Sequence, residues 1–119
     1  MKEAEQLVRS AIKLDEERAE AENKKALDNP FYLDSLGYIL FKQNRLTEAR
    51  QLMERCVATK EGMRIESFDH LGDVLLALGK RQEAIEAWKT GIALAREERQ
   101  DAKIKGDVVS KLRKLGSAP

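Results

Sequence analysis

The sequence predicts an all-α protein built from stacked helical hairpins, and two observations support this prediction. The first is an internal repeat, because identical or similar residues recur at seven positions with a constant offset of 35 residues. Leu36-Gly37, for example, returns as Leu71-Gly72, and Leu40 returns as Leu75. The second is that the apolar residues within each copy follow the spacing of an amphipathic helix. A period of this length indicates one supersecondary unit used repeatedly, with neighbours covering each other's apolar faces.

Composition fits a single small helical domain. Of the 119 residues, 42% are hydrophobic and 36% charged, and the net charge is +1. Such a balance gives no reason to expect a nucleic acid or an anionic membrane as partner. Apolar runs are only a few residues long, so we expect no membrane-spanning segment and a cytoplasmic location, although a leader removed from a precursor stays open. Cys56 is the only cysteine, which excludes an internal disulfide and a thiolate zinc site.

Residues 1–28 are expected to form one long helix, over about 2–27. Its first half repeats the second helix of the first unit at an offset of 45 residues, which is ten more than the period. The extra residues fall in the segment 15–28, which lacks glycine and proline and has a favourable Glu20–Lys24 spacing. We therefore predict the second helix of a repeat whose first helix is missing, with a polar half that projects beyond the stack.

The first full unit covers residues 29–62. Asn29 supplies a capping side chain and Pro30 suits the first helical turn, so a helix should begin there. Its apolar residues recur at helical spacing as far as Phe41. The polar segment 43–45 then interrupts the pattern, which resumes from Leu46, so a short turn and a second amphipathic helix follow.

The second full unit covers residues 63–105, and a last segment covers 106–119. Gly79 should end the first helix of this unit, because glycine tolerates positive φ. Since no helix breaker lies between Leu94 and Gly106, the second helix is expected to continue through residue 105. A separate helix after Gly106, with one apolar stripe, would then cap the open end of the stack.

Glycine occurs in the middle of the first helix of each unit, at Gly37 and Gly72. Glycine there costs about 1 kcal/mol relative to alanine. Close approach of the partner helix is the expected compensation, and Ala49 and Ala84 are expected to face these glycines.

The two units resemble tetratricopeptide repeats. The resemblance depends on small and apolar residues at the family's positions over residues 30 to about 95, and the segment 32–40 is most similar to bacterial members. It implies a right-handed α-solenoid of about six helices, with two full repeats, a partial N-terminal one and a C-terminal capping helix. The period of 35 instead of 34 and the lack of a closing proline are departures that affect the loops. The matching residues are Leu33, Leu36, Gly37, Leu40, Ala49, Met53 and Cys56, then Phe68, Leu71, Gly72, Leu75, Ala84, Trp88 and Gly91.

No pattern of a catalytic or metal site stands out, and we expect neither an enzyme nor a cofactor or metal. Cys56 falls on the inner helix face and is interpreted as a small buried residue. His70 lies near Glu66, Asp69 and Asp73, which could form a weak metal site, but a solvated acidic face is the favoured interpretation.

The resemblance also implies a concave groove, formed by the first helices, that binds peptides. Here it would be acidic with an aromatic floor, so a protein or peptide with basic residues and an apolar anchor is the expected partner. The alternative is that the short groove binds nothing tightly. No clamp for a C-terminal carboxylate is expected. The expected groove residues are Phe31, Asp34, Ser35, Tyr38, Phe41, Lys42, Glu66, Asp69, His70, Asp73, Leu76 and Ala77.

A second hypothesis is a self-assembling or structural scaffold, natural or engineered, or a truncated longer array. It rests on the N-terminal helix, whose apolar strip Leu7, Val8, Ala11 and Ile12 lacks a covering first helix. An exposed strip of this kind can recruit a second copy, which would give a homo-oligomer.

Overall fold

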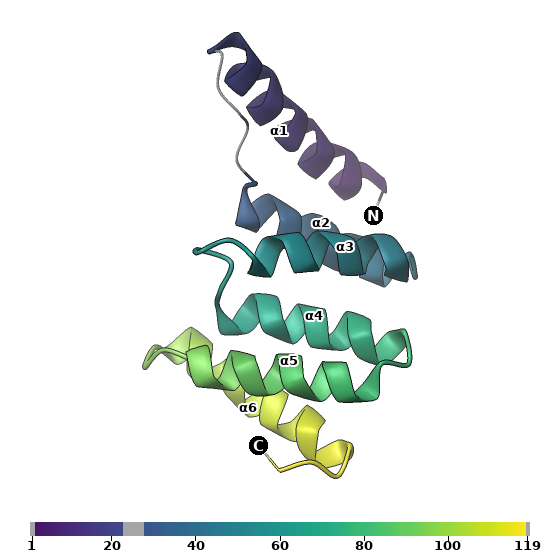
Figure 1. The fold of residues 1–119 in the computed structure, drawn as a ribbon, viewed down its shortest axis with the longest axis vertical. Coiled ribbons are helices and arrows are strands. Elements are labelled where there is room, and N and C mark those ends of the chain that lie inside the picture. The colour runs from purple at the N-terminus through teal and green to yellow at the C-terminus, as the bar shows by residue number, and fades with distance from the viewer. Residues whose placement is uncertain (1, 23–27, 119) are drawn as a thin grey trace.

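The computed structural model describes residues 2–22 and 28–118, and these form six helices and no strand. The helices follow one another along a stack with the termini at opposite ends (Figure 1), and the longest dimension is 50 Å. This arrangement confirms the predicted all-α hairpin architecture. No helix in the described ranges is both long and apolar enough to cross a membrane. The helices are α1 (Lys2–Ala21), α2 (Pro30–Lys42), α3 (Leu46–Val57), α4 (Ile65–Ala77), α5 (Arg81–Leu94) and α6 (Arg99–Lys114).

The first hairpin consists of α2 and α3, and its boundaries are those predicted. The Asn29 side chain caps α2 by accepting hydrogen bonds from the backbone N–H groups of Phe31 and Tyr32, at 3.0 and 3.3 Å. Asn44 adopts a φ of 61° in the turn, a conformation that asparagine tolerates better than most residues. The second hairpin consists of α4 and α5, and Gly79 ends α4 with a φ of 78°, as expected.

Close helix contact at the two mid-helix glycines is confirmed. A Cβ atom at Gly37 would lie 2.6 Å from the Met53 Sδ atom, and one at Gly72 would overlap the indole ring of Trp88. The expected neighbour Ala49 contributes only its carbonyl oxygen, 3.6 Å from the position of that Cβ atom. The glycines therefore make room for the large side chains of α3 and α5.

The N-terminal helix differs from the hairpins because none of its residues is buried. It packs on α2 and ends at Ala21, while residues 23–27, which were expected to continue it, lie outside the described residues. An ion pair joins it to the first hairpin, with Arg45 Nη1 3.0 Å from Glu5 Oε1. Figure 1 shows its C-terminal half leaning away from the stack.

At the C-terminal end the predicted helix boundaries are wrong. α5 ends at Leu94 instead of continuing through residue 105, and α6 begins at Arg99 with Gly106 inside it. The backbone turns at Ala95 (φ −60°, ψ 132°), and Arg96 N–H donates to Asp101 Oδ2 at 2.8 Å. This turn lets α6 fold back onto α4 and α5, and the resulting apolar burial outweighs the helix propensity of the segment. The expected capping role of the last helix is confirmed, because its side chains join the hydrophobic core.

Candidate interaction surfaces

Two sides of the stack are distinguished by the helices that form them. The helix-A surface is formed by α2, α4 and α6, which pack against one another in that order. The helix-B surface is formed by α1, α3 and α5, which are each separated by an intervening helix of the other set. The residues predicted to bind a peptide lie on α2 and α4, and therefore belong to the helix-A surface.

Asp34 was expected in an accessible groove, but only 4% of it is exposed. Its carboxylate lies between α2 and α4, 2.7 Å from His70 Nδ1 and 3.4 Å from an Arg64 guanidinium nitrogen. Burial opposes protonation of His70, yet the hydrogen bond to Asp34 and the charges of Asp34, Asp69 and Glu66 outweigh it and raise the His70 pKa. The Asp34–His70 contact thus joins the two repeats and is not an open binding group.

Three potential metal ligands meet at the same place. Oxygen or nitrogen atoms of Asp34, Glu66 and His70 lie within 4.8 Å of one another. Arg64 forms ion pairs with both carboxylates, at 3.0 Å from Glu66 Oε2 and 3.4 Å from Asp34 Oδ2, so both already have a cationic partner. The cluster is therefore described as a histidine–arginine–carboxylate network.

Asp69 and Asp73 form the other acidic part of the helix-A surface, and Lys111 of α6 forms an ion pair with each of them. Its Nζ atom lies 2.7 Å from Asp69 Oδ1 and 2.9 Å from Asp73 Oδ1, and 5.9 Å from the centre of the Trp88 ring. Burial opposes the charge on Lys111, but the two carboxylates outweigh this effect and raise its pKa. The interpretation of a solvated acidic face is wrong here, because α6 folds over it.

Aromatic residues expected to line the groove lie near one another on α2. Tyr38 lies 4.7 Å from the His70 ring and 6.2 Å from the Phe41 ring, measured between ring centres. Phe31 is 53% exposed and is covered on one face by the Arg64 guanidinium at 5.0 Å. Of the remaining expected groove residues, all are exposed at the surface: Ser35, Lys42, Leu76 and Ala77.

The lone cysteine is buried, as predicted. Its Sγ atom lies 3.2 Å from the Pro30 carbonyl oxygen and 3.6 Å from Ser67 Oγ. Burial raises the pKa of the Cys56 thiol, which keeps it protonated at neutral pH.

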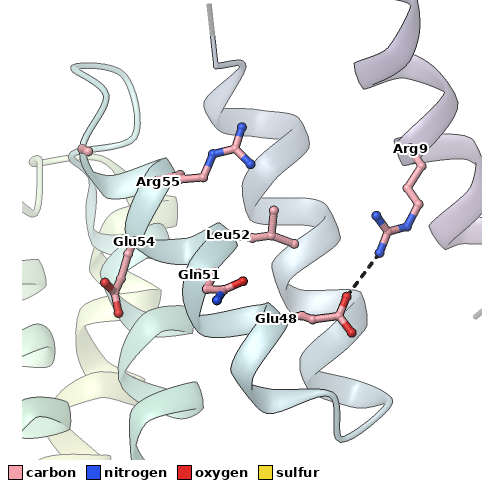
Figure 2. Close-up of a pocket in the computed structure, with 7 residues that line it drawn as sticks. Arg9, Glu48, Gln51, Leu52, Glu54 and Arg55 are labelled. Carbon is pink, nitrogen blue, oxygen red and sulfur yellow. Dashed lines mark ion pairs between the residues drawn. The ribbon is translucent and has the colours of Figure 1, made fainter.

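Clefts open on the helix-B surface, where the sequence analysis did not predict a cleft. One lies between α1 and α3 above α2, with adjoining volumes of about 590 and 450 Å³ that share Arg9, Leu52 and Arg55. Figure 2 shows Arg9 reaching across it towards Glu48, and their charged atoms are 3.7 Å apart. Its remaining lining residues are Ile12, Lys13, Glu16, Leu33, Leu36, Gln51, Glu54 and Ala58.

A cleft of about 310 Å³ occupies the equivalent place one repeat later, between α3 and α5 above α4. Its floor residues Phe68 and Leu71 are the repeat counterparts of Leu33 and Leu36. The 35-residue offset relates the residues that line the two clefts, so the sequence contained the correspondence between these positions. It did not show that a cleft forms at them.

The residues expected for self-association lie on α1. Leu7 is 73% exposed, whereas Val8 and Ile12 are partly buried and pack against the core, and Ala11 is partly buried. Leu14, which was not predicted, is 59% exposed. The exposed apolar surface of α1 therefore centres on two leucines instead of the four residues named from the sequence.

Comparison with known families supports the resemblance. A family model described as tetratricopeptide repeat matches residues 32–61, which cover most of α2, all of α3 and part of the following loop. No curated protein and no solved structure matched the chain. The stacked helical hairpins are therefore consistent with a tetratricopeptide-type fold, and the family match itself is confined to the first hairpin. Repeats of this family generally mediate protein–protein interactions and are typically not enzymes.

Proposed function

We propose that the chain is a non-catalytic protein-binding module whose helix-A surface holds a segment of a protein partner. The observation that supports this is the row of aromatic side chains along α2, of which Phe31 is more than half exposed. A partly exposed aromatic row next to polar groups is the kind of surface that receives an apolar anchor from a partner.

The charge of this surface limits the choice of partner. Asp34, Asp69 and Asp73 all have cationic neighbours within the protein, so a basic segment would have to displace Arg64 or Lys111. We therefore propose an apolar-anchored partner segment, with a preference for basic residues that emerges only when Lys111 is removed.

Panning a phage-displayed library of random peptides against the protein tests this function. Enriched peptides should carry an aromatic or aliphatic anchor, and Phe31→Ser combined with Tyr38→Ser should weaken their binding by about tenfold or more. Met63→Ser is the matched control, because Met63 is 51% exposed in the loop before α4. Lys111→Gln should shift the selected peptides towards basic sequences. Failure to enrich any peptide, or equal binding by the aromatic variant and the control, would contradict the proposal.

A second candidate function is self-association through α1. It is favoured by Leu7 and Leu14, which are 73% and 59% exposed on a helix without a buried residue. Light scattering from micromolar to millimolar protein tests it directly. A rising mass supports self-association, and a monomer at every concentration excludes it.

A further inference from the structure

One end of the stack is a helix of the first type in a repeat, and the other end is a helix of the second type. α6 takes the place of a first helix of a repeat, because it packs on α4 and α5 as α4 packs on α2 and α3. α1 corresponds to a second helix, since its sequence matches α3 at an offset of 45 residues. Within the described residues, neither of these two helices has a hairpin partner. Figure 1 places them at opposite ends of the molecule, so they cannot pair within one copy.

On α6, the face that corresponds to the α5-contacting face of α4 is not covered by another helix. An offset of 34 residues aligns its buried Val108 with Val74 of α4, and also aligns Gly106 with Gly72. Gly72 is covered by Trp88 of α5, whereas a Cβ atom at Gly106 would have nothing within 4 Å. On α6 the face that would contact a second helix is Ala102, Lys105, Gly106 and Val109, and all four are exposed or partly exposed.

On α1, the face that corresponds to the α2-contacting face of α3 is also not fully covered. In α3 the residues that face α2 include Ala49, Met53 and Cys56, each with 0% exposure. Their counterparts in α1 are Ala4, which is exposed, and Val8 and Ala11, which are only partly buried, although Val8 also packs against the core. The counterpart of Leu52 is Leu7, which is 73% exposed. A helix placed beside α1, as α2 lies beside α3, would cover all four of these positions.

The charges of the two helices are opposite. α6 carries six basic and two acidic residues, a net charge of +4, while α1 carries four basic and six acidic residues, a net charge of −2. The hairpins are antiparallel, so the start of α6 would lie beside the end of α1. The start of α6 has Arg99 and Lys103 beside one acidic residue, Asp101. The end of α1 has Glu16, Glu17 and Glu20 beside one basic residue, Arg18, so the two ends keep opposite net charges. Attraction between these ends favours one orientation of pairing.

We propose that two copies associate head to tail, with α6 of one copy and α1 of the next forming a composite repeat. This inference rests on self-association through α1, the second proposed function, and assigns the surface that α1 contacts. The unoccupied space at Gly106 receives the Val8 region of α1, as Gly37 receives Met53. Because the two contacting surfaces differ, the contact is heterologous and adds further copies at both ends.

Two variants that block one face each test the proposal. Gly106→Gln fills the space on α6, and its added side chain meets no atom of its own copy within 4 Å of Cβ. Ala4→Arg combined with Leu7→Arg places positive charge on the exposed face of α1, towards the basic α6. All three positions are exposed, so both variants should keep the helical circular dichroism signal of the wild type. Gly106→Gln should melt no lower than the wild type, because glutamine favours a helix more than glycine does.

Because the contacting faces of α6 and α1 are different, each variant blocks one face and leaves the other intact. Wild-type protein should form a growing series of oligomers by sedimentation velocity and light scattering, weakened by salt. Each variant alone should stay monomeric or associate about tenfold or more weakly. An equimolar mixture of the two variants should give a dimer and nothing larger, because it contains one intact α6 face and one intact α1 face per pair.

Three other results would overturn the proposal in distinguishable ways. If Gly106→Gln associates as strongly as the wild type, self-association stands but α6 is not the contact. If the mixture of variants stays monomeric, the two faces do not pair. If the wild type is monomeric throughout, both this inference and the second proposed function fail, while peptide binding on the helix-A surface is unaffected.

Discussion

The two end helices close the same stack, yet they are held in different ways. α6 buries Val108 and Leu112 completely, with 0% exposure for each, whereas α1 has no buried residue. The reason is the number of neighbours, because α6 packs against both α4 and α5 while α1 packs on α2 alone. In this stack, the terminal helix that contacts both helices of a hairpin has fully buried side chains, whereas the one that packs on a single helix has none.

Removal of apolar side chains from the two ends gives the largest expected difference. Leu112→Ala should lower the free energy of unfolding by about 2–5 kcal/mol, because it leaves a cavity in the core. Leu7→Ala should change it by no more than about 0.5 kcal/mol, since Leu7 is mostly in water. Urea unfolding of dilute protein measures both values. Similar losses from the two substitutions would show that α1 is part of the cooperative core.

Glycine-to-alanine substitutions compare α2 and α4, whose glycines are covered by a partner helix, with α6, whose Gly106 is not. Gly72→Ala should destabilise the protein by about 1–3 kcal/mol, because the new methyl group overlaps the rigid Trp88 ring. Gly37→Ala should cost less, since the Met53 thioether that it meets is flexible. Gly106→Ala should instead stabilise the monomer by up to about 1 kcal/mol through helix propensity. Thermal unfolding ranks the three, and a destabilised Gly106→Ala monomer would mean that this face of α6 is already occupied.

The ion pair that holds α6 should contribute more to the free energy of unfolding than the ion pair that holds α1. Lys111→Met removes the cation between Asp69 and Asp73, whose side chains are only 14% and 22% exposed, and should cost about 1–2 kcal/mol. Arg45→Met removes one of two arginine partners of Glu5. It should cost less, because Arg9 still pairs with Glu5 and the Arg45 side chain is itself 39% exposed. Urea unfolding of both variants provides the comparison, and a larger loss for Arg45→Met would reverse the order proposed for the two ends.

Acid should loosen α1 before α6. Hydrogen bonds from Arg9, and then from Arg45, lower the Glu5 pKa below its ordinary value of 4.5, against the opposing effect of burial. A depressed pKa means that the stabilisation is present above pH 4.5 and is lost as the pH falls through the folded value. Hydrogen exchange below pH 4.5 should therefore show that α1 loses protection relative to α6, with the difference growing as the pH falls. Uniform protection of both helices at low pH would contradict this.

Much of the fold could be predicted because its signals are local. The Asn29 cap, the turn at 43–45 and Gly79 each act within a few residues, and the 35-residue offset related the two hairpins. The end of α5 could not be predicted in this way, since the segment after Leu94 has good helix formers throughout. The break there is decided by the apolar stripe of α6, which reaches α4 and α5 only if the chain turns.

The candidate surface was predicted only in part, and charge explains why. The aromatic residues of α2 lie on the helix-A surface as expected, but the acidic residues that should have made it attractive to a basic partner already have partners. Asp34 pairs with His70, 36 residues away, and Asp69 pairs with Lys111, 42 residues away. Such contacts have no local signature in the sequence. The acidic residues could therefore be identified from the sequence, but their cationic partners could not.

The sequence by itself determined the repeat, the helical hairpins, their caps and the small residues that let the helices approach, because each follows from the spacing and type of nearby residues. Tertiary structure alone decided where α5 ends, which charges neutralise one another, where the helix-B clefts open and which faces of α1 and α6 stay uncovered. These features depend on which helices meet in space. Burial and electrostatic energies between residues far apart in the chain therefore set them, while helix propensity sets the elements that they join.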